Sequence, residues 1–167
     1  AALLEEAAHR LQVAPDQLVP RVDSLLTELE QARKRSETLE RELLRRQVRE
    51  LPQRQIGGTG VVSGILSVSS PELLREAGDW LRNDVKSGVV VLGMVLEGRP
   101  TMIVMATRDV VARGFHAGNV VRDAARAMGG GGGGRPEMGQ AGGREPGKLQ
   151  DALQAAEEEI RRWGEKP

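Results

Sequence analysis

The sequence contains no cysteine and only three aromatic residues, Phe115, Trp80 and Trp163, among its 167 residues. The lack of cysteine excludes a disulfide framework, a thiolate nucleophile and a cysteine-ligated zinc site. It also fits a cytoplasmic protein. The scarcity of aromatic side chains argues against a stacking platform for single-stranded nucleic acid. No stretch approaches the roughly 20 apolar residues that a membrane span needs, so we expect no membrane partner.

Catalytic constellations are equally scarce. The two histidines, His9 and His116, lie in different segments, and a lone histidine is more often structural than catalytic. The acidic run Glu157-Glu158-Glu159 is typical of a solvated helix face. We therefore predict no metal, no cofactor and no enzymatic turnover for this chain on its own.

The net charge is zero, but the charges are unevenly distributed. Residues 99–144 contain seven arginines and three acidic residues, which gives this window a net charge of +4. A basic patch on a neutral protein can still steer a polyanion toward it. The sequence begins Ala1-Ala2-Leu3 without a methionine, which indicates a piece of a longer protein.

Residues 1–54 predict a helical arm, with a long helix that begins near Pro20 and ends at Leu51-Pro52. Apolar residues recur along it at the 3-4 spacing of a coiled coil, although Ala32, Ser36 and Arg46 weaken the pattern. This seam either packs against its own chain or joins two copies in a homodimer. The dimerisation candidates are Val22, Leu25, Leu29, Leu39 and Leu43.

Residues 55–60 are glycine-rich and predict a hinge, and residues 61–167 predict a small globular domain. Short β-branched runs predict strands near 61–68, 89–96 and 101–107, and their near-continuous apolar character indicates burial on both faces. Helices are predicted from Ser70-Pro71, over 117–128 and over 148–163. The expected fold class is α/β (α+β), a small mixed-sheet domain with flanking helices behind a long N-terminal helical arm.

Six consecutive glycines follow Met128, and Arg135 follows them directly. Glycine lets backbone N–H groups approach a ligand closely, and such loops cradle phosphate groups. A Walker motif is excluded because the lysine-hydroxyl pair is missing and a helix, not a strand, precedes the tract. On these residues alone, the stretch is either a phosphate-binding loop or a flexible linker.

The neighbouring residues carry a resemblance to a known family. His116-Ala117-Gly118-Asn119 opens the segment, the glycine tract continues into Arg-Pro-Glu-Met and Gln-Ala-Gly-Gly, and a helix begins near Lys148. This pattern resembles the C-terminal, DHHA1-type domain of alanyl-tRNA synthetases. The stretch from Val13 to Leu44 is similar to the helices that precede this domain in the same family. The resemblance covers nearly the whole chain and is most specific over residues 115–143.

The resemblance implies a role. In the family this domain contacts the outer corner of the tRNA, helps present it for aminoacylation and editing, and can contribute to dimerisation. Two positions depart from the pattern: the family usually has a basic residue in place of Gly131 and favours alanine in place of Gly139. The expected partners are alanine tRNA, the catalytic and editing domains of the same parent chain, and a second copy of the chain.

The RNA-binding candidates are the glycines together with nearby cations. Arg122 and Arg126 are four residues apart and project from one helix face. The full set is Gly129, Gly130, Gly131, Gly132, Gly133, Gly134, Arg135, Arg122, Arg126 and Lys148. Two alternative functions stay open: a coiled-coil oligomerisation module with incidental RNA binding, and a substrate-binding domain of the DHH-phosphoesterase type.

Overall fold

The computed structural model describes residues 1–167 and divides into two compact units, Ala1–Glu42 and Leu43–Pro167. The first unit contains α1 (Ala2–Arg10), a short 3-10 turn (Pro15–Gln17) and most of α2 (Leu18–Glu50). Ala14 lies in the connection between α1 and α2, and its backbone is extended because it precedes Pro15. Pro20 lies in the first turn of α2, where its missing N–H costs no helical hydrogen bond. No helix has both the length and the apolar character required to cross a membrane.

The second unit begins inside α2, where Leu44 is fully buried in the core of the globular domain. The sequence placed the boundary at residue 54 instead. Ten further elements and two 3-10 turns follow. They are β1 (Gln53–Ile56), β2 (Thr59–Ile65), α3 (Pro71–Asp84), β3 (Val89–Leu96), β4 (Arg99–Ala106), α4 (Arg108–Ala112), α5 (Ala117–Ala125), β5 (Gly131–Gly134), β6 (Met138–Gly142) and α6 (Leu149–Gly164).

Residues 55–60, expected as a hinge between domains, form instead a hairpin inside the second unit. Ile56 of β1 pairs with Thr59 of β2, and Gly57-Gly58 make the turn between them. Both glycines have positive φ, +58° and +80°, the conformation that a two-residue hairpin turn of this hand requires. A side chain on Gly57 would also meet the backbone oxygen of Arg161 at 2.7 Å.

The six strands form one mixed sheet in the order β1-β2-β3-β4-β6-β5. The β2–β3 pair is parallel because α3 carries the chain across the sheet between them, and all the other pairs are antiparallel. The helix α3 starts as the sequence predicted, with the Ser70 hydroxyl accepting the backbone N–H of Leu73 at 3.2 Å. The predicted mixed-sheet α/β fold with flanking helices is confirmed.

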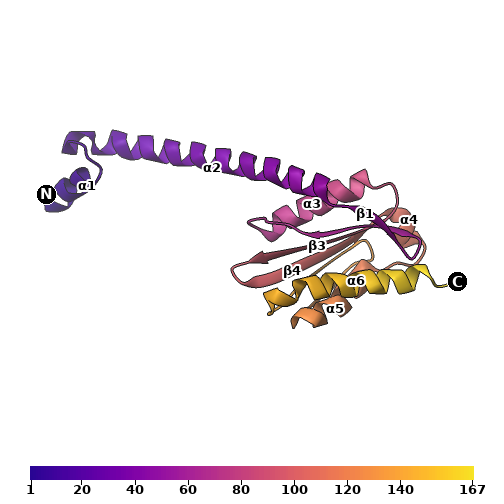
Figure 1. Cartoon of the computed structure of the whole chain (residues 1–167). Helices are drawn as coiled ribbons and strands as arrows, with labels where there is room; N and C mark the ends of the chain where they lie inside the picture. The colour runs from indigo at the N-terminus through magenta and orange to yellow at the C-terminus, as the bar shows by residue number, and fades with distance from the viewer. The chain divides into compact units, whose positions relative to one another are not determined.

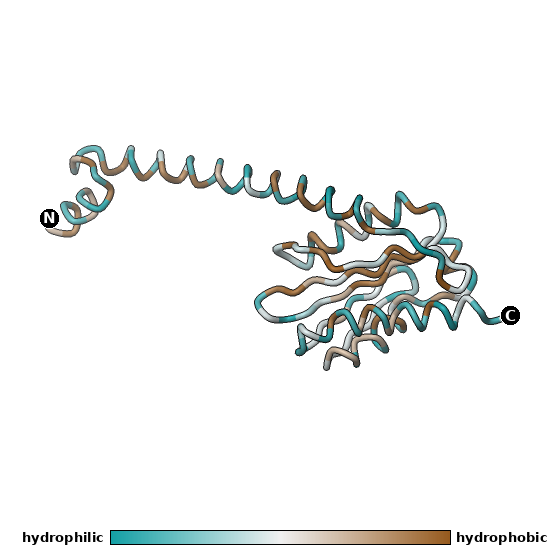
Figure 2. Tube along the Cα trace, in the orientation of Figure 1, coloured by the Kyte–Doolittle hydropathy of each residue, from teal (hydrophilic) through white to brown (hydrophobic).

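Alternate residues of the central strands enter two separate cores. Val91 and Val104 pack with α5 and α6 on one face, whereas Val90 and Ile103 pack with α3 and Leu44 on the other. Figure 1 shows α5 and α6 together on one side of the sheet and α3 on the other. Figure 2 shows the hydrophobic colouring running through β3 and β4, which are covered on both faces.

Candidate nucleic-acid interface

The glycine tract is a strand and not the loop that the sequence predicted. Gly131–Gly134 form β5, the edge strand of the sheet, and pair with Gly139–Gly142 of β6. A tight turn joins the two strands. In it, the Arg135 N–H donates to the Met138 carbonyl at 2.9 Å, and the Met138 N–H donates to the Arg135 carbonyl at 3.3 Å. The tract is therefore held in place by backbone pairing along its length.

Close packing explains half of the glycines in this strand. A Cβ on Gly132 would overlap the Gln140 carbonyl of β6, and a Cβ on Gly134 would overlap the Met138 carbonyl. At the start of α5, the Gly118 N–H donates to the Arg135 carbonyl at 3.0 Å, and the Ala117 N–H donates to the Pro136 carbonyl at 2.9 Å. These protein carbonyls occupy the helix N-terminus that a phosphate would otherwise use.

The other two glycines of the strand face open space. A Cβ on Gly131 or on Gly133 would have no neighbouring atom within 4 Å. Packing therefore requires glycine at Gly132 and Gly134, and leaves the other two positions free to meet a ligand.

One end of the tract lines a cavity of about 500 Å³, which we call the glycine pocket. Its lining consists of Arg99, Pro100, Thr101, Gly129, Gly130, Gly131, Gly142, Gly143 and Arg144. It has two exposed guanidinium groups, no carboxylate and five glycines. Glu145 approaches Gly129 beside this lining. Bare backbone between two arginines is an arrangement suited to phosphate oxygens, because each guanidinium can donate two hydrogen bonds.

The predicted cations do not converge on this pocket. Arg135 pairs with Glu137 at 3.0 Å, and Lys148 pairs with Asp151 at 3.7 Å. Arg122 and Arg126 both pair with Asp123, at 3.3 Å and 3.7 Å. All four cations are exposed, and exposed ion pairs of this kind contribute about 0–1 kcal/mol, so a phosphate can replace the acid at small cost. Gly132, Gly133 and Gly134 also lie outside the lining.

Arg126 lines a second cavity, of about 600 Å³, between α5 and α6, which we call the α5–α6 pocket. Its lining includes Phe115, His116, Asn119, Asp123, Arg126, Glu159, Arg162, Trp163 and Lys166. The Phe115 and Trp163 rings meet edge to face, with centroids 5.2 Å apart. The His116 ring caps α5, because its Nδ1 accepts the N–H of Asn119 at 3.0 Å.

Two carboxyl groups face each other in this pocket and hydrogen-bond to one another. Partial burial, and then the neighbouring Asp123, raise the pKa of Glu159 to about 7. Burial also acts to raise the pKa of Asp123. The hydrogen bonds from Glu159 and Arg122 and the charges of Arg122 and Arg126 outweigh this, so the pKa of Asp123 is lowered. The pair therefore takes up one proton, on Glu159, as the pH falls through about 7.

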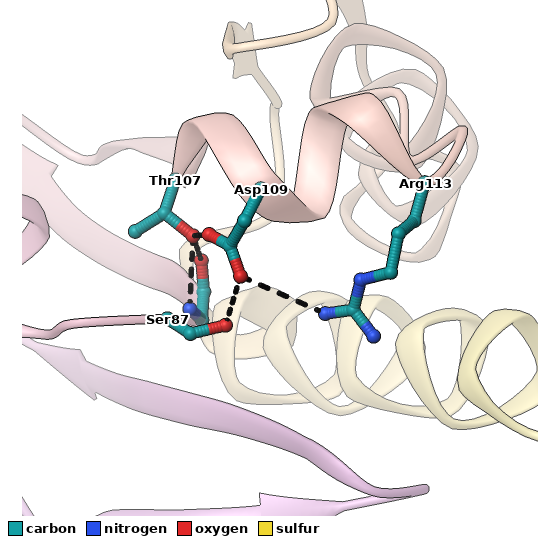
Figure 3. Close-up of polar contacts among 5 residues, drawn as sticks. Ser87, Thr107, Asp109 and Arg113 are labelled. Atoms are coloured by element: carbon teal, nitrogen blue, oxygen red, sulfur yellow. Dashed lines mark hydrogen bonds and ion pairs between the residues drawn. The ribbon is translucent and has the colours of Figure 1, made fainter.

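A polar network joins Ser87, Thr107, Asp109 and Arg113 at the start of α4 (Figure 3). Asp109 accepts hydrogen bonds from the hydroxyls of Ser87 and Thr107, which lower the pKa of its carboxyl. Asp109 also pairs with Arg113 at 4.0 Å, and the Arg113 guanidinium lies 5.5 Å from the Trp163 ring centroid. Arg113 thus connects the network at the start of α4 to the indole that lines the pocket.

The fold and the glycine hairpin define the class of protein. Residues 58–162 match the family model of the DHHA1 domain, and the chain belongs to this family. The resemblance inferred from the sequence is confirmed.

The particular relatives are alanine–tRNA ligases. The one from Acetivibrio thermocellus is 42% identical over 156 residues, and the one from Pelotomaculum thermopropionicum is 40% identical over 153 residues. The alignments cover 92% and 90% of this chain but only 18% and 17% of those proteins, so the chain spans less than a fifth of its relatives' length. The crystal structure of the C-Ala domain from Aquifex aeolicus alanyl-tRNA synthetase matches with a TM-score of 0.61 and 25% identity. That match covers 66% of this chain and 99% of the other.

Proposed function

We propose that this chain is the tRNA-binding domain of an alanine–tRNA ligase, and that it contacts the body of the tRNA through the glycine pocket. One observation carries the proposal: Arg99 and Arg144 flank five glycines in a cavity that no carboxylate lines. Recognition of a folded RNA depends on backbone and shape, which bare peptide groups and guanidinium groups can read. In the parent chain, this contact would assist aminoacylation and editing of alanine tRNA.

The first test is a titration with alanine tRNA at two salt concentrations. Replacing Arg99 and Arg144 by alanine is expected to weaken binding by about tenfold and to lower the salt dependence by about one to two counterions. The control replaces Arg82 and Arg161, which removes the same charge at two arginines that lie outside the glycine pocket and pair with acids on their own helices. An equal loss in the control pair would show that only net charge matters.

The identity of the RNA contact is tested with a tRNA whose elbow loops are deleted. Binding that requires the elbow supports contact with the tRNA body. Equal binding to both RNAs would contradict this assignment. The same pocket offers a place for a small phosphorylated ligand, the phosphoesterase-type alternative, and a nucleotide that displaces tRNA from the glycine pocket would favour that alternative.

A second function follows from α2. The seam residues Val22, Leu29, Leu39 and Leu43 are 40%, 48%, 52% and 59% exposed, so the chain itself does not cover them. We infer that a second copy covers this seam in a coiled-coil homodimer, because a/d-type residues left in water are stabilised by helix pairing. Sedimentation of the chain at high micromolar concentration tests this, and a monomer at that concentration would contradict the inference.

A further inference from the structure

The α5–α6 pocket holds most of the aromatic surface of a chain that has very little. Two of the three aromatic side chains, Phe115 and Trp163, line it. Phe115 is 2% exposed, whereas Trp163 is only partly buried and keeps some of its surface accessible. An aromatic side chain that lines a cavity gives a nucleobase a surface to stack on, and such stacking tolerates any base.

Cations surround this aromatic surface. Arg162 lies on α6, Lys166 follows the end of that helix, and Arg126 lies at the C-terminal end of α5; all three line the pocket. The side chain of Arg126 is 74% exposed, and its partner Asp123 is 3.7 Å away. The pocket therefore combines a planar apolar surface with three groups that can donate to a phosphate.

The acids of the pocket do not cancel these cations. Asp123 and Glu159 are the two carboxyl groups of the lining, and they share one proton by hydrogen-bonding to each other. With that proton present, three cations of the lining face one negative charge. An anion is therefore attracted to the cavity.

Size and independence also fit a single nucleotide. The volume of about 600 Å³ lies in the range of small-molecule sites, roughly 300–1,000 Å³. No residue of this lining belongs to the glycine pocket, so the two cavities are separate sites on the second unit.

We propose that the α5–α6 pocket binds one unpaired nucleotide of the bound RNA, with the base against Trp163 and the phosphate among Arg126, Arg162 and Lys166. The proposal rests on the proposed function in that it requires an RNA ligand, but it uses a different surface. It assigns the pocket a base-stacking contact that complements the phosphate contacts of the glycine pocket.

The direct test uses Trp163 as its own reporter. In a Trp80→Phe background, Trp163 is the only tryptophan of the chain. Titration with adenosine monophosphate is expected to change its fluorescence saturably. Adenosine and inorganic phosphate, tested separately, should each bind at least about tenfold more weakly, because each supplies only half of the contacts. The absence of any saturable change with adenosine monophosphate would overturn the proposal.

The cations are tested in the same background with Arg162→Ala combined with Lys166→Ala. Both residues are exposed, so the fold is expected to survive, and an unchanged circular dichroism spectrum checks this. We expect about a tenfold loss of adenosine monophosphate affinity. An unchanged affinity would overturn the assignment of these residues.

Titration with tRNA separates this proposal from the proposed function. If Arg99→Ala with Arg144→Ala weakens tRNA binding and Arg162→Ala with Lys166→Ala does not, the nucleotide proposal fails and the glycine-pocket function stands. If only the second pair weakens it, the nucleotide proposal stands and the glycine pocket does not contact the RNA. If the unmodified chain binds no tRNA, both proposals fail, even if the chain binds adenosine monophosphate.

Discussion

The two units treat the same apolar residues in opposite ways. In the second unit, Leu44, Leu74 and Leu92 are fully buried between the sheet and its helices. In the first, Leu26 and Leu29 remain 59% and 48% exposed on α2. Helices of the second unit cover both faces of the sheet. The long helix α2 instead has an apolar stripe on which no other element of the chain packs. The second unit thus closes its own core, and the first offers an unfilled surface.

The largest loss of stability is expected at a buried leucine of α2 whose sequence neighbour is exposed. Leu44 is 0% exposed and Leu43 is 59% exposed on the same helix. Leu44→Ala should lower the free energy of unfolding by about 2–5 kcal/mol, because it leaves a cavity under α3. Leu43→Ala should change it by less than about 0.5 kcal/mol in a monomeric sample. Urea denaturation followed by circular dichroism measures both. Similar losses would mean that the end of α2 is not part of the core.

Neighbouring glycines of β5 also differ in the space around them: one is tightly packed and the next faces open space. A Cβ at Gly132 would overlap the Gln140 carbonyl and lie 2.5 Å from the Cα of Ala141, whereas a Cβ at Gly133 would meet nothing within 4 Å. We expect Gly132→Ala to cost about 1–3 kcal/mol through overpacking. Gly133→Ala should be neutral, or stabilising by about 0.4–1 kcal/mol through the unfolded chain. Thermal melts of the two variants compare them directly, and equal melting temperatures would contradict the packing role of Gly132.

The exposed seam of α2 is tested by placing a charged side chain in it. Leu29→Lys places an ammonium group where two copies would meet, and its desolvation should weaken self-association by at least about tenfold, or about 1.4 kcal/mol. Gln31→Lys adds the same charge off the seam and is the control. Sedimentation equilibrium measures the association constants. The inference of a homodimer fails if both variants associate like the unmodified chain.

Strong local patterns were predictable from the sequence. The apolar runs that became β3 and β4, and the Ser70-Pro71 start of α3, have side chains that determine their structure locally. The strands β1 and β5 were not predicted. Gln53–Ile56 is polar at three of four positions, and Gly131–Gly134 has no side chains at all, so pairing with a neighbour makes both into strands.

The site was predictable only in part. The glycine tract and the basic window over 99–144 could both be read from the residues, but not which arginines adjoin which glycines. Arg99 and Arg144 are far apart in sequence, and the sheet register brings them together, because Gly142 pairs with Thr101 on one side and with Gly131 on the other. The α5–α6 pocket depends on two helices packing across a chain separation of more than 30 residues, which no local spacing encodes.

The smallest effect concerns the partly buried carboxyl pair of Asp123 and Glu159 in the second unit. Because the pKa of Glu159 is raised to about 7 from 4.5, the folded state binds its proton more tightly than the unfolded state does. This contribution to stability is fully present below pH 4.5 and is lost as the pH rises through 7. Since Glu159 is only partly buried and solvent screens the pair, we expect a change of less than about 1 kcal/mol.

Glu159→Gln keeps the hydrogen-bonding shape without a titrating group, so its stability should not show this decline between pH 4.5 and 7. The charged or titratable groups around the pair are Arg122, Arg126, Arg162, Lys166 and His116, and they remain in the variant. Glu158→Gln is the control, because Glu158 is exposed on the same helix and pairs with Arg161. Urea melts across this range measure the three proteins. A decline that persists in Glu159→Gln would assign it to other groups. A decline lost only in this variant would show that the second unit has a proton-sensitive contact between α5 and α6 at the pocket that we assign to a nucleotide.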